Sequence, residues 1–129
     1  MGCPFRKKPE VIWDVHPVFN EQYFIDAIVD AYRDVLQSDD YKPTVTSARD
    51  GDEHSKYSLH YSGEAIDLRT KDIKDQGLIS TIADLMVIFL KHSLPEYKWV
   101  VIDESKKKAH IHIQTSHKNV NMKRSNAYA

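Results

Sequence analysis

The chain has 129 residues, of which 41% are hydrophobic and 29% charged, and its formal net charge is −1. These values are typical of one water-soluble globular domain, and they give no electrostatic reason to expect nucleic acid as a partner. The single cysteine, Cys3, excludes an intrachain disulfide, and no apolar run is long enough to insert into a membrane as a helix. We expect one monomeric domain over residues 1–129, cytoplasmic at synthesis because no signal peptide is evident.

The N-terminal part of the chain predicts an arm followed by a helix. Residues 1–17 hold three of the five prolines and several charges, which favours an extended arm that Trp13 and Val15 pin to the body. Residues 20–37 then place their apolar side chains at the spacing of one helix face. Asn20 is one of the residue types preferred at the start of a helix, so we expect it to be the N-cap.

The rest of the chain alternates between strand patterns, one more helix pattern and polar connections. The predicted elements are a strand at 44–47, a polar loop at 48–58, a strand at 63–70, a helix at about 76–92, strands at 97–104 and 109–115, and a polar tail at 116–129. A short polar link between the last two strands predicts a hairpin. The fold class that we expect is α+β, with a small antiparallel sheet that carries the helices on one face and leaves the other partly open.

Strand alternation predicts which side chains meet on the face away from the helices. In the last strand, isoleucines alternate with His110 and His112, so both imidazoles point away from the core. In the second strand, Asp67 points the same way, and the small Ala65 leaves space beside it. His60 precedes Asp67 by seven residues across a turn and can fold back over that face.

Two histidines and a carboxylate are a common ligand set for catalytic zinc, which keeps its fourth position for water. Zinc lowers the pKa of that water to about 7, so hydroxide becomes available at neutral pH. An ordinary polar sheet face is the alternative interpretation of His110 and His112 alone. The stretch HxxGxAxD, from His60 to Asp67, favours the metal site because it combines a histidine, a turn glycine, a small residue and an acid that faces the same side as the two imidazoles.

Two stretches resemble a known superfamily. "SLHYSGEAIDLRTKD" (58–72) and "DESKKKAHIHI" (103–113) are similar to the hedgehog signalling domain. They also resemble, more distantly, the zinc peptidases of that fold, namely D-alanyl-D-alanine carboxypeptidases and phage endolysins that cut peptidoglycan stem peptides. The shared pattern is S-x-H-x-x-G-x-A-x-D followed by H-x-H, and the resemblance covers roughly residues 44–115. It implies a hedgehog/DD-peptidase-like fold with a zinc cleft on the sheet face opposite the helices.

The resemblance also implies roles for individual residues. By this similarity His60, Asp67 and His112 are the three zinc ligands. Glu104 corresponds to the general base and acid of the peptidases, which takes a proton from the attacking water and passes it to the leaving amine. His110 corresponds to the histidine that stabilises the oxyanion or transfers a proton.

Further matches lie in the polar loop. His54 resembles a histidine that lines the hedgehog zinc cleft, and Arg49 resembles a peptidase arginine that binds the substrate carbonyl or carboxylate. The alternatives are a loop histidine and a loop charge. For Glu104 the alternative is a solvent-exposed hairpin residue. Of the two neighbouring acids, strand alternation favours Glu104 over Asp103 as the residue that faces the site.

This sequence differs from the hedgehog pattern in ways that change the function we expect. Asp50 and Asp52 match part of the hedgehog calcium cluster, but Ser47 replaces an acid, so calcium is less favoured than a single zinc ion. The lack of a signal peptide and an autoprocessing domain argues against a secreted animal signal. We expect a zinc metallopeptidase, a carboxypeptidase or endopeptidase, that acts on peptidoglycan or a similar short peptide, reaching the cell wall after release. The alternative is a non-catalytic, hedgehog-like binding module that contains zinc.

Overall fold

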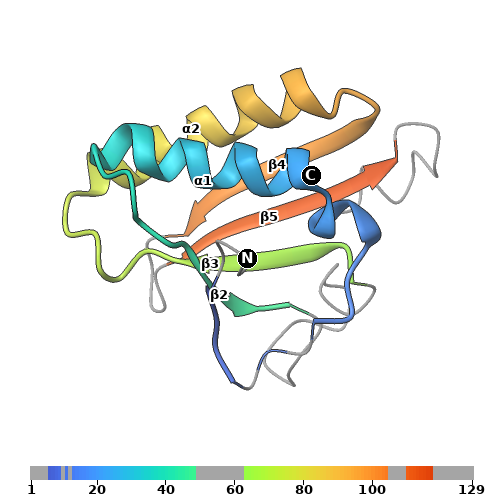
Figure 1. Cartoon of the computed structure of the whole chain (residues 1–129), viewed down its shortest axis with the longest axis horizontal. Helices are drawn as coiled ribbons and strands as arrows, with labels where there is room; N and C mark the ends of the chain where they lie inside the picture. The colour runs from blue at the N-terminus through green and yellow to red at the C-terminus, as the bar shows by residue number, and fades with distance from the viewer. Residues whose placement is uncertain (1–5, 10, 12, 49–62, 105–109, 118–129) are drawn as a thin grey trace.

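A computed structural model describes residues 6–9, 11, 13–48, 63–104 and 110–117 (Figure 1). Within these residues there are two α-helices, α1 (Gln22–Leu36) and α2 (Gln76–Ser93), and one 3-10 helix, η1 (Pro17–Asn20). The five strands of the described part are β1 (Arg6–Lys7), β2 (Thr44–Ser47), β3 (Ala65–Arg69), β4 (Tyr97–Glu104) and β5 (His110–His117). The α+β class expected from the sequence is therefore confirmed.

The strands form one sheet in the order β1-β2-β3-β5-β4. The pairs from β2 to β4 are antiparallel, whereas β1 lies parallel to β2. The backbone N–H of Arg6 donates to the Pro43 carbonyl at 2.8 Å, and that of Lys8 donates to the Val45 carbonyl at 3.1 Å. The sheet is thus mixed, and the prediction of a purely antiparallel sheet is wrong at this edge, where the arm contributes a strand.

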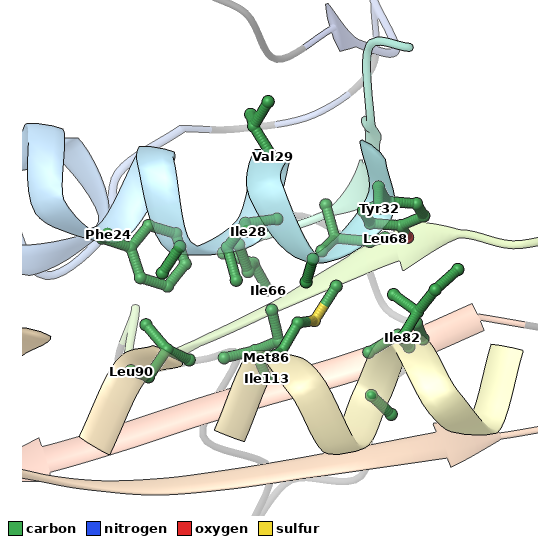
Figure 2. Close-up of a cluster of buried hydrophobic side chains, with 14 of the residues drawn as sticks. Phe24, Ile28, Val29, Tyr32, Ile66, Leu68, Ile82, Met86, Leu90 and Ile113 are labelled. Carbon is green, nitrogen blue, oxygen red and sulfur yellow. The ribbon is translucent and has the colours of Figure 1, made fainter. Parts of the chain in front are cut away.

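Both helices lie on the same side of the sheet (Figure 1). Their buried side chains meet those of β3 and β5 in a single hydrophobic cluster. In Figure 2, Ile28 of α1 and Met86 of α2 point toward Ile66 of β3 and Ile113 of β5, and all four are fully buried. Alternation along β3 and β5 therefore turns the residues between these isoleucines to the opposite face.

Helix α1 begins differently from the prediction. Its N-cap is Glu21, which makes no side-chain capping bond. Asn20 instead uses its Oδ1 to accept a hydrogen bond from the indole Nε1 of Trp13 at 2.8 Å. Trp13 and Val15 are partly buried against the core, as expected for residues that pin the arm to the body. The amide of Asn20 is thus used for a tertiary contact, and this outweighs the capping preference.

The other boundaries agree more closely with the sequence patterns. Helix α2 follows Asp75, whose carboxylate accepts the backbone N–H of Gly77 at 2.8 Å, as an N-cap should. β2 and β4 have the bounds that were predicted, while β3 is shorter and β5 extends two residues further than predicted. Among the described residues, neither helix has the length and apolar character needed to cross a membrane.

Candidate metal centre

The pairing of β3 with β5 brings the candidate ligands together. Asp67 lies directly opposite His112, and Arg69 lies directly opposite His110. All four side chains are on the sheet face turned away from α1 and α2. We call this the site face, and its side chains in the described strands include Asp67, Arg69, Ile102, Glu104, His110, His112 and Gln114.

The imidazole of His112 is held between two side-chain oxygens. Its Nδ1 lies 2.9 Å from Oδ1 of Asp67, and its Nε2 lies 2.8 Å from Oε1 of Gln114. Both oxygens are acceptors, so each ring nitrogen faces a group to which it can donate. Asp67 and Gln114 are buried, which fixes the ring from both sides.

His110 completes a compact cluster of donor atoms. Its Nε2 lies 3.7 Å from Oδ1 of Asp67, which is beyond a hydrogen bond but within the distance of an ion pair when the ring is protonated. One ligand atom from each of Asp67, His110 and His112 lies within 4.8 Å of the other two. The His110 side chain is 25% exposed, against 15% for His112, so His110 is nearer to the solvent.

The donor set fits a zinc ion. Tetrahedral zinc with nitrogen and oxygen ligands at about 2.0–2.1 Å places neighbouring donor atoms roughly 3.3 Å apart. The distances of 2.9 Å and 3.7 Å from Asp67 Oδ1 to the two imidazoles lie on either side of this value. A metal at Nδ1 of His112 would replace one proton of the ring, and the remaining Nε2–H would donate to Gln114. Metal-ligating histidines usually have such a second partner.

The electrostatics of the cluster favour positive charge. Burial alone would lower the pKa of His112, but the hydrogen bond and the negative charge of Asp67 outweigh burial, and Gln114 and Glu104 add to their effect. The pKa of His112 is therefore raised above its ordinary value of 6.5. A site that stabilises a proton between an imidazole and a carboxylate is also suited to a metal cation.

Strand β4 places Glu104 beside the cluster. Glu104 pairs with His110 across the β4–β5 ladder, and Ile102 pairs with His112. Glu104 is exposed, and Ile102 is 40% exposed. Asp103 pairs with Ile111 and accepts a hydrogen bond from Gln76 of α2 at 3.5 Å, so it points to the helix side. Of the two neighbouring acids, Glu104 is the one on the site face.

The backbone around Asp67 is shaped by two local features. β2 carries a bulge opposite Asp67, because Val45 pairs with Leu68 whereas Ser47 pairs with Asp67. Gly63, just before β3, has a φ of 75°, and its carbonyl accepts the backbone N–H of His16 at 2.8 Å. A left-handed residue here lets the chain turn into β3, which explains the glycine of the HxxGxAxD stretch. Bulges of this kind commonly re-aim side chains next to functional sites.

Several predicted site residues lie outside the described residues. These are His60, the third predicted zinc ligand, and the loop residues Arg49, Asp50, Asp52 and His54. The structure therefore brings together Asp67, His110 and His112, with Glu104 on the adjacent strand.

Strand alternation places Gln114 and Arg69 on the site face, but neither residue was given a role from the sequence. Gln114 hydrogen-bonds His112, and Arg69 pairs with His110. Both stand two residues from a candidate ligand on the same strand, which predicts their facing, whereas their contacts require the fold.

Comparison with known proteins gives no assignment. No protein-family model matches the chain, and no curated protein sequence matches it. Functional inference consequently rests on the site itself.

Proposed function

We propose that the chain is a zinc-dependent peptidase that hydrolyses peptidoglycan stem peptides or similar short peptides. The observation that carries the proposal is the convergence of Asp67, His110 and His112 within 4.8 Å. The residue-by-residue resemblance of the two stretches around them to the zinc peptidases adds to it. In the proposed assignment two of these three residues, Asp67 and His112, are ligands, and His110 is the histidine beside the ion. Asp67 and His112, directly paired across β3 and β5, would hold the ion together with His60.

Zinc, when bound, supplies a water of lowered pKa and polarises the scissile carbonyl. The chain's own residues then manage protons and charge. Glu104 takes a proton from the attacking water as its oxygen bonds to the carbonyl carbon. Glu104 returns the proton to the amide nitrogen as the C–N bond breaks, so that a carboxylate and an amine leave.

His110 is suited to the developing negative charge. It lies two residues from His112 along β5, directly opposite Glu104 of β4, and it is the more exposed of the two histidines. We assign it to donate a hydrogen bond to the carbonyl oxygen as that oxygen becomes an anion. The pairing of Glu104 with His110 across the ladder supports the assignment of the proton shuttle and the anion donor to neighbouring residues.

The experiment is to incubate zinc-loaded protein with a purified muropeptide mixture and to identify products by mass. The wild-type chain should bind about one zinc and release hydrolysis products. Glu104→Gln should keep the zinc and lose at least 100-fold in rate, which is the low end of the contribution of a general base. Asp103→Asn is the matched control, because Asp103 is the adjacent acid but faces α2, and it should keep the activity.

The same assay separates the peptidase from a non-catalytic zinc module. A module would bind zinc and lose thermal stability when the metal is chelated, yet show no turnover on any peptide. Undiminished hydrolysis by Glu104→Gln would reject the proposed mechanism even if the protein is a peptidase.

A further inference from the structure

Strand β4 forms a long and regular edge of the sheet. It is the last strand in the order β1-β2-β3-β5-β4, and within the described chain β5 is its only strand partner (Figure 1). The pairing runs over Tyr97–Glu104 without a change of register and without a proline, so no bulge or break blunts the edge. The outer rim of such a strand carries backbone N–H and C=O groups that can pair with a further strand.

Backbone alternation identifies the groups on the outer rim of β4. The N–H of Thr115 in β5 donates to the carbonyl of Glu64 at 3.0 Å, so the backbone groups of Thr115 point toward β3. In an antiparallel ladder, neighbouring residues of one strand point these groups to opposite sides. The backbone groups of Gln114 therefore face its partner Val100 in β4. The rim groups consequently belong to the alternate residues of β4, namely Trp99, Val101 and Asp103.

The side chains of β4 on the site face are complementary to a second copy of the same strand. They begin with a cation, continue with two β-branched residues and end with an acid, in the order Lys98, Val100, Ile102 and Glu104. When two copies run antiparallel about Val101, Lys98 of each lies opposite Glu104 of the other. Val100 lies opposite Ile102 in the same way. Opposite charges and β-branched pairs are both favourable across a ladder, and the contact would cover Ile102, which is 40% exposed.

The backbone of β4 favours the same register. About Val101 the rim residues pair with one another, since Val101 meets its own copy and Trp99 meets Asp103. Each of these pairs can exchange two N–H···O=C bonds. The site-face pairs then occupy the positions between them, where the α-carbons of an antiparallel ladder lie only about 4.5 Å apart. A slip of two residues in either direction would keep the faces but set a charged side chain opposite an apolar one.

We propose that two copies of the chain associate through β4 into a symmetric dimer with one continuous sheet. This dimer departs from the monomer expected from the sequence, and it does not depend on the peptidase activity. Its two-fold axis passes between the two Val101 residues, perpendicular to the sheet, so both site faces lie on the same side. Each copy thereby adds Lys98 to the other's candidate metal centre, opposite Glu104. Strand spacing and rise put the two His112 α-carbons roughly 15 Å apart.

Sedimentation of the full chain in an analytical ultracentrifuge measures the association, and the wild-type chain should form dimers as its concentration rises. Lys98→Glu and Glu104→Lys should each raise the dimer dissociation constant about 10-fold, because like charges then face each other at both symmetry-related positions. Combining the two changes restores opposite charges, so the double variant should associate like the wild-type chain. The two positions lie about 20 Å apart within one strand, so this rescue cannot arise inside a single copy.

Lys42→Glu is the matched control for the charge variants. It makes the same charge change at an exposed residue just before β2, toward the opposite edge of the sheet, and it should leave the dissociation constant unchanged. The proposal is overturned if the wild-type chain stays monomeric at about 1 mM, where association is very weak. It is also overturned by a dimer that neither charge variant weakens, or whose association the double variant does not restore.

Disulfide trapping tests the register by a second route. In a Cys3→Ser background, Val101→Cys puts the two thiols at the axis, where the α-carbons of a hydrogen-bonded pair lie about 5.5 Å apart, within the range of a disulfide. Asp103→Cys is the control, because its two copies lie about 14 Å apart in the same dimer. Mild oxidation should give a covalent dimer from the Val101 variant and not from the Asp103 variant. Equal trapping in both variants, or none in the Val101 variant, would reject this dimer.

Discussion

His112 lies directly across the β3–β5 ladder from Asp67, and its Nδ1 is 2.9 Å from the Asp67 Oδ1. Gln114 holds the other ring nitrogen at 2.8 Å. In the metal-free chain an imidazole with an acceptor on each side is best satisfied when it carries two protons. Zinc at Nδ1 would take the place of one of them, so proton and metal compete for the same position between His112 and Asp67.

Asp67→Asn should abolish tight zinc binding. The substitution removes the negative charge and one ligand atom at once, while the side-chain volume hardly changes. Zinc affinity should fall by more than the roughly 10- to 100-fold that a residue outside the ligand set costs. Competition with a chromophoric chelator measures this.

Asp72→Asn is the control for the Asp67 substitution. Asp72 is an exposed acid bonded to Tyr41 rather than to an imidazole, so this variant should bind zinc like the wild-type chain. Equal zinc affinity in the Asp67 and Asp72 variants would show that the metal binds elsewhere.

Gln114→Ala should weaken zinc binding without removing a ligand. Gln114 fixes the orientation of His112 through the 2.8 Å contact to Nε2, and loss of such a partner typically costs about 10- to 100-fold in metal affinity. Gln114→Glu keeps an acceptor at the same place and should retain tight binding. The ring-nitrogen NMR shifts of zinc-loaded protein should report Nε2–H in the wild-type chain, and an unchanged zinc affinity in the Ala variant would argue against the role of Gln114.

The stability of the metal-free chain should fall as pH rises. Because the pKa of His112 is raised above 6.5 in the folded state, the protonated ring stabilises the fold. This contribution is fully present below pH 6.5 and is lost as pH rises through the higher folded pKa. Urea midpoints of chelator-treated protein between pH 5 and 9 measure it, and His112→Gln should flatten the slope.

Zinc affinity should change with pH in the opposite direction. The ring must lose a proton to bind the metal, so affinity rises across the same pH range in which the metal-free fold weakens. If the stability of the metal-free chain and the zinc affinity changed with pH in the same direction, His112 would be excluded as the group whose titration controls both.

The part of the site that follows from strand alternation could be predicted from the sequence. The spacing of His110 and His112 between isoleucines fixes their facing, and the same argument separates Glu104 from Asp103. Contacts across long sequence separations could not be predicted in this way. The bond of His112 to Asp67, 45 residues away, is one such contact. At shorter range, Asn20 ends η1 and bonds Trp13, so that Glu21 rather than Asn20 precedes α1.

Other features carry no periodic signal at all. β1 has only two residues, Arg6 and Lys7, which is too short for an alternation pattern, and its parallel pairing depends on where the arm meets β2. The site-face position of Arg69 follows from alternation with Asp67, but the lack of a hydrogen-bond partner for its Nε among the described residues is visible only once the neighbouring side chains are placed. Sequence patterns thus predict which side of the sheet a side chain faces, whereas its hydrogen-bond partners are known only once the chain is folded.

Gly63→Ala should destabilise the fold by about 1–3 kcal/mol, because an L-residue is strained at a φ of 75°. The added Cβ would also stand 2.7 Å from the backbone oxygen of Asp14, in a segment that cannot yield without disturbing the His16–Gly63 hydrogen bond. Urea denaturation of the chelator-treated chain measures the loss.

Gly77→Ala provides the matched comparison for Gly63→Ala. Its Cβ would meet only the Asp75 carboxylate at 3.1 Å, and alanine favours a helix over glycine by about 1 kcal/mol. This variant should therefore be close to neutral or slightly stabilised. A similar loss of stability in both variants would mean that the left-handed turn before β3 is not what requires glycine at Gly63.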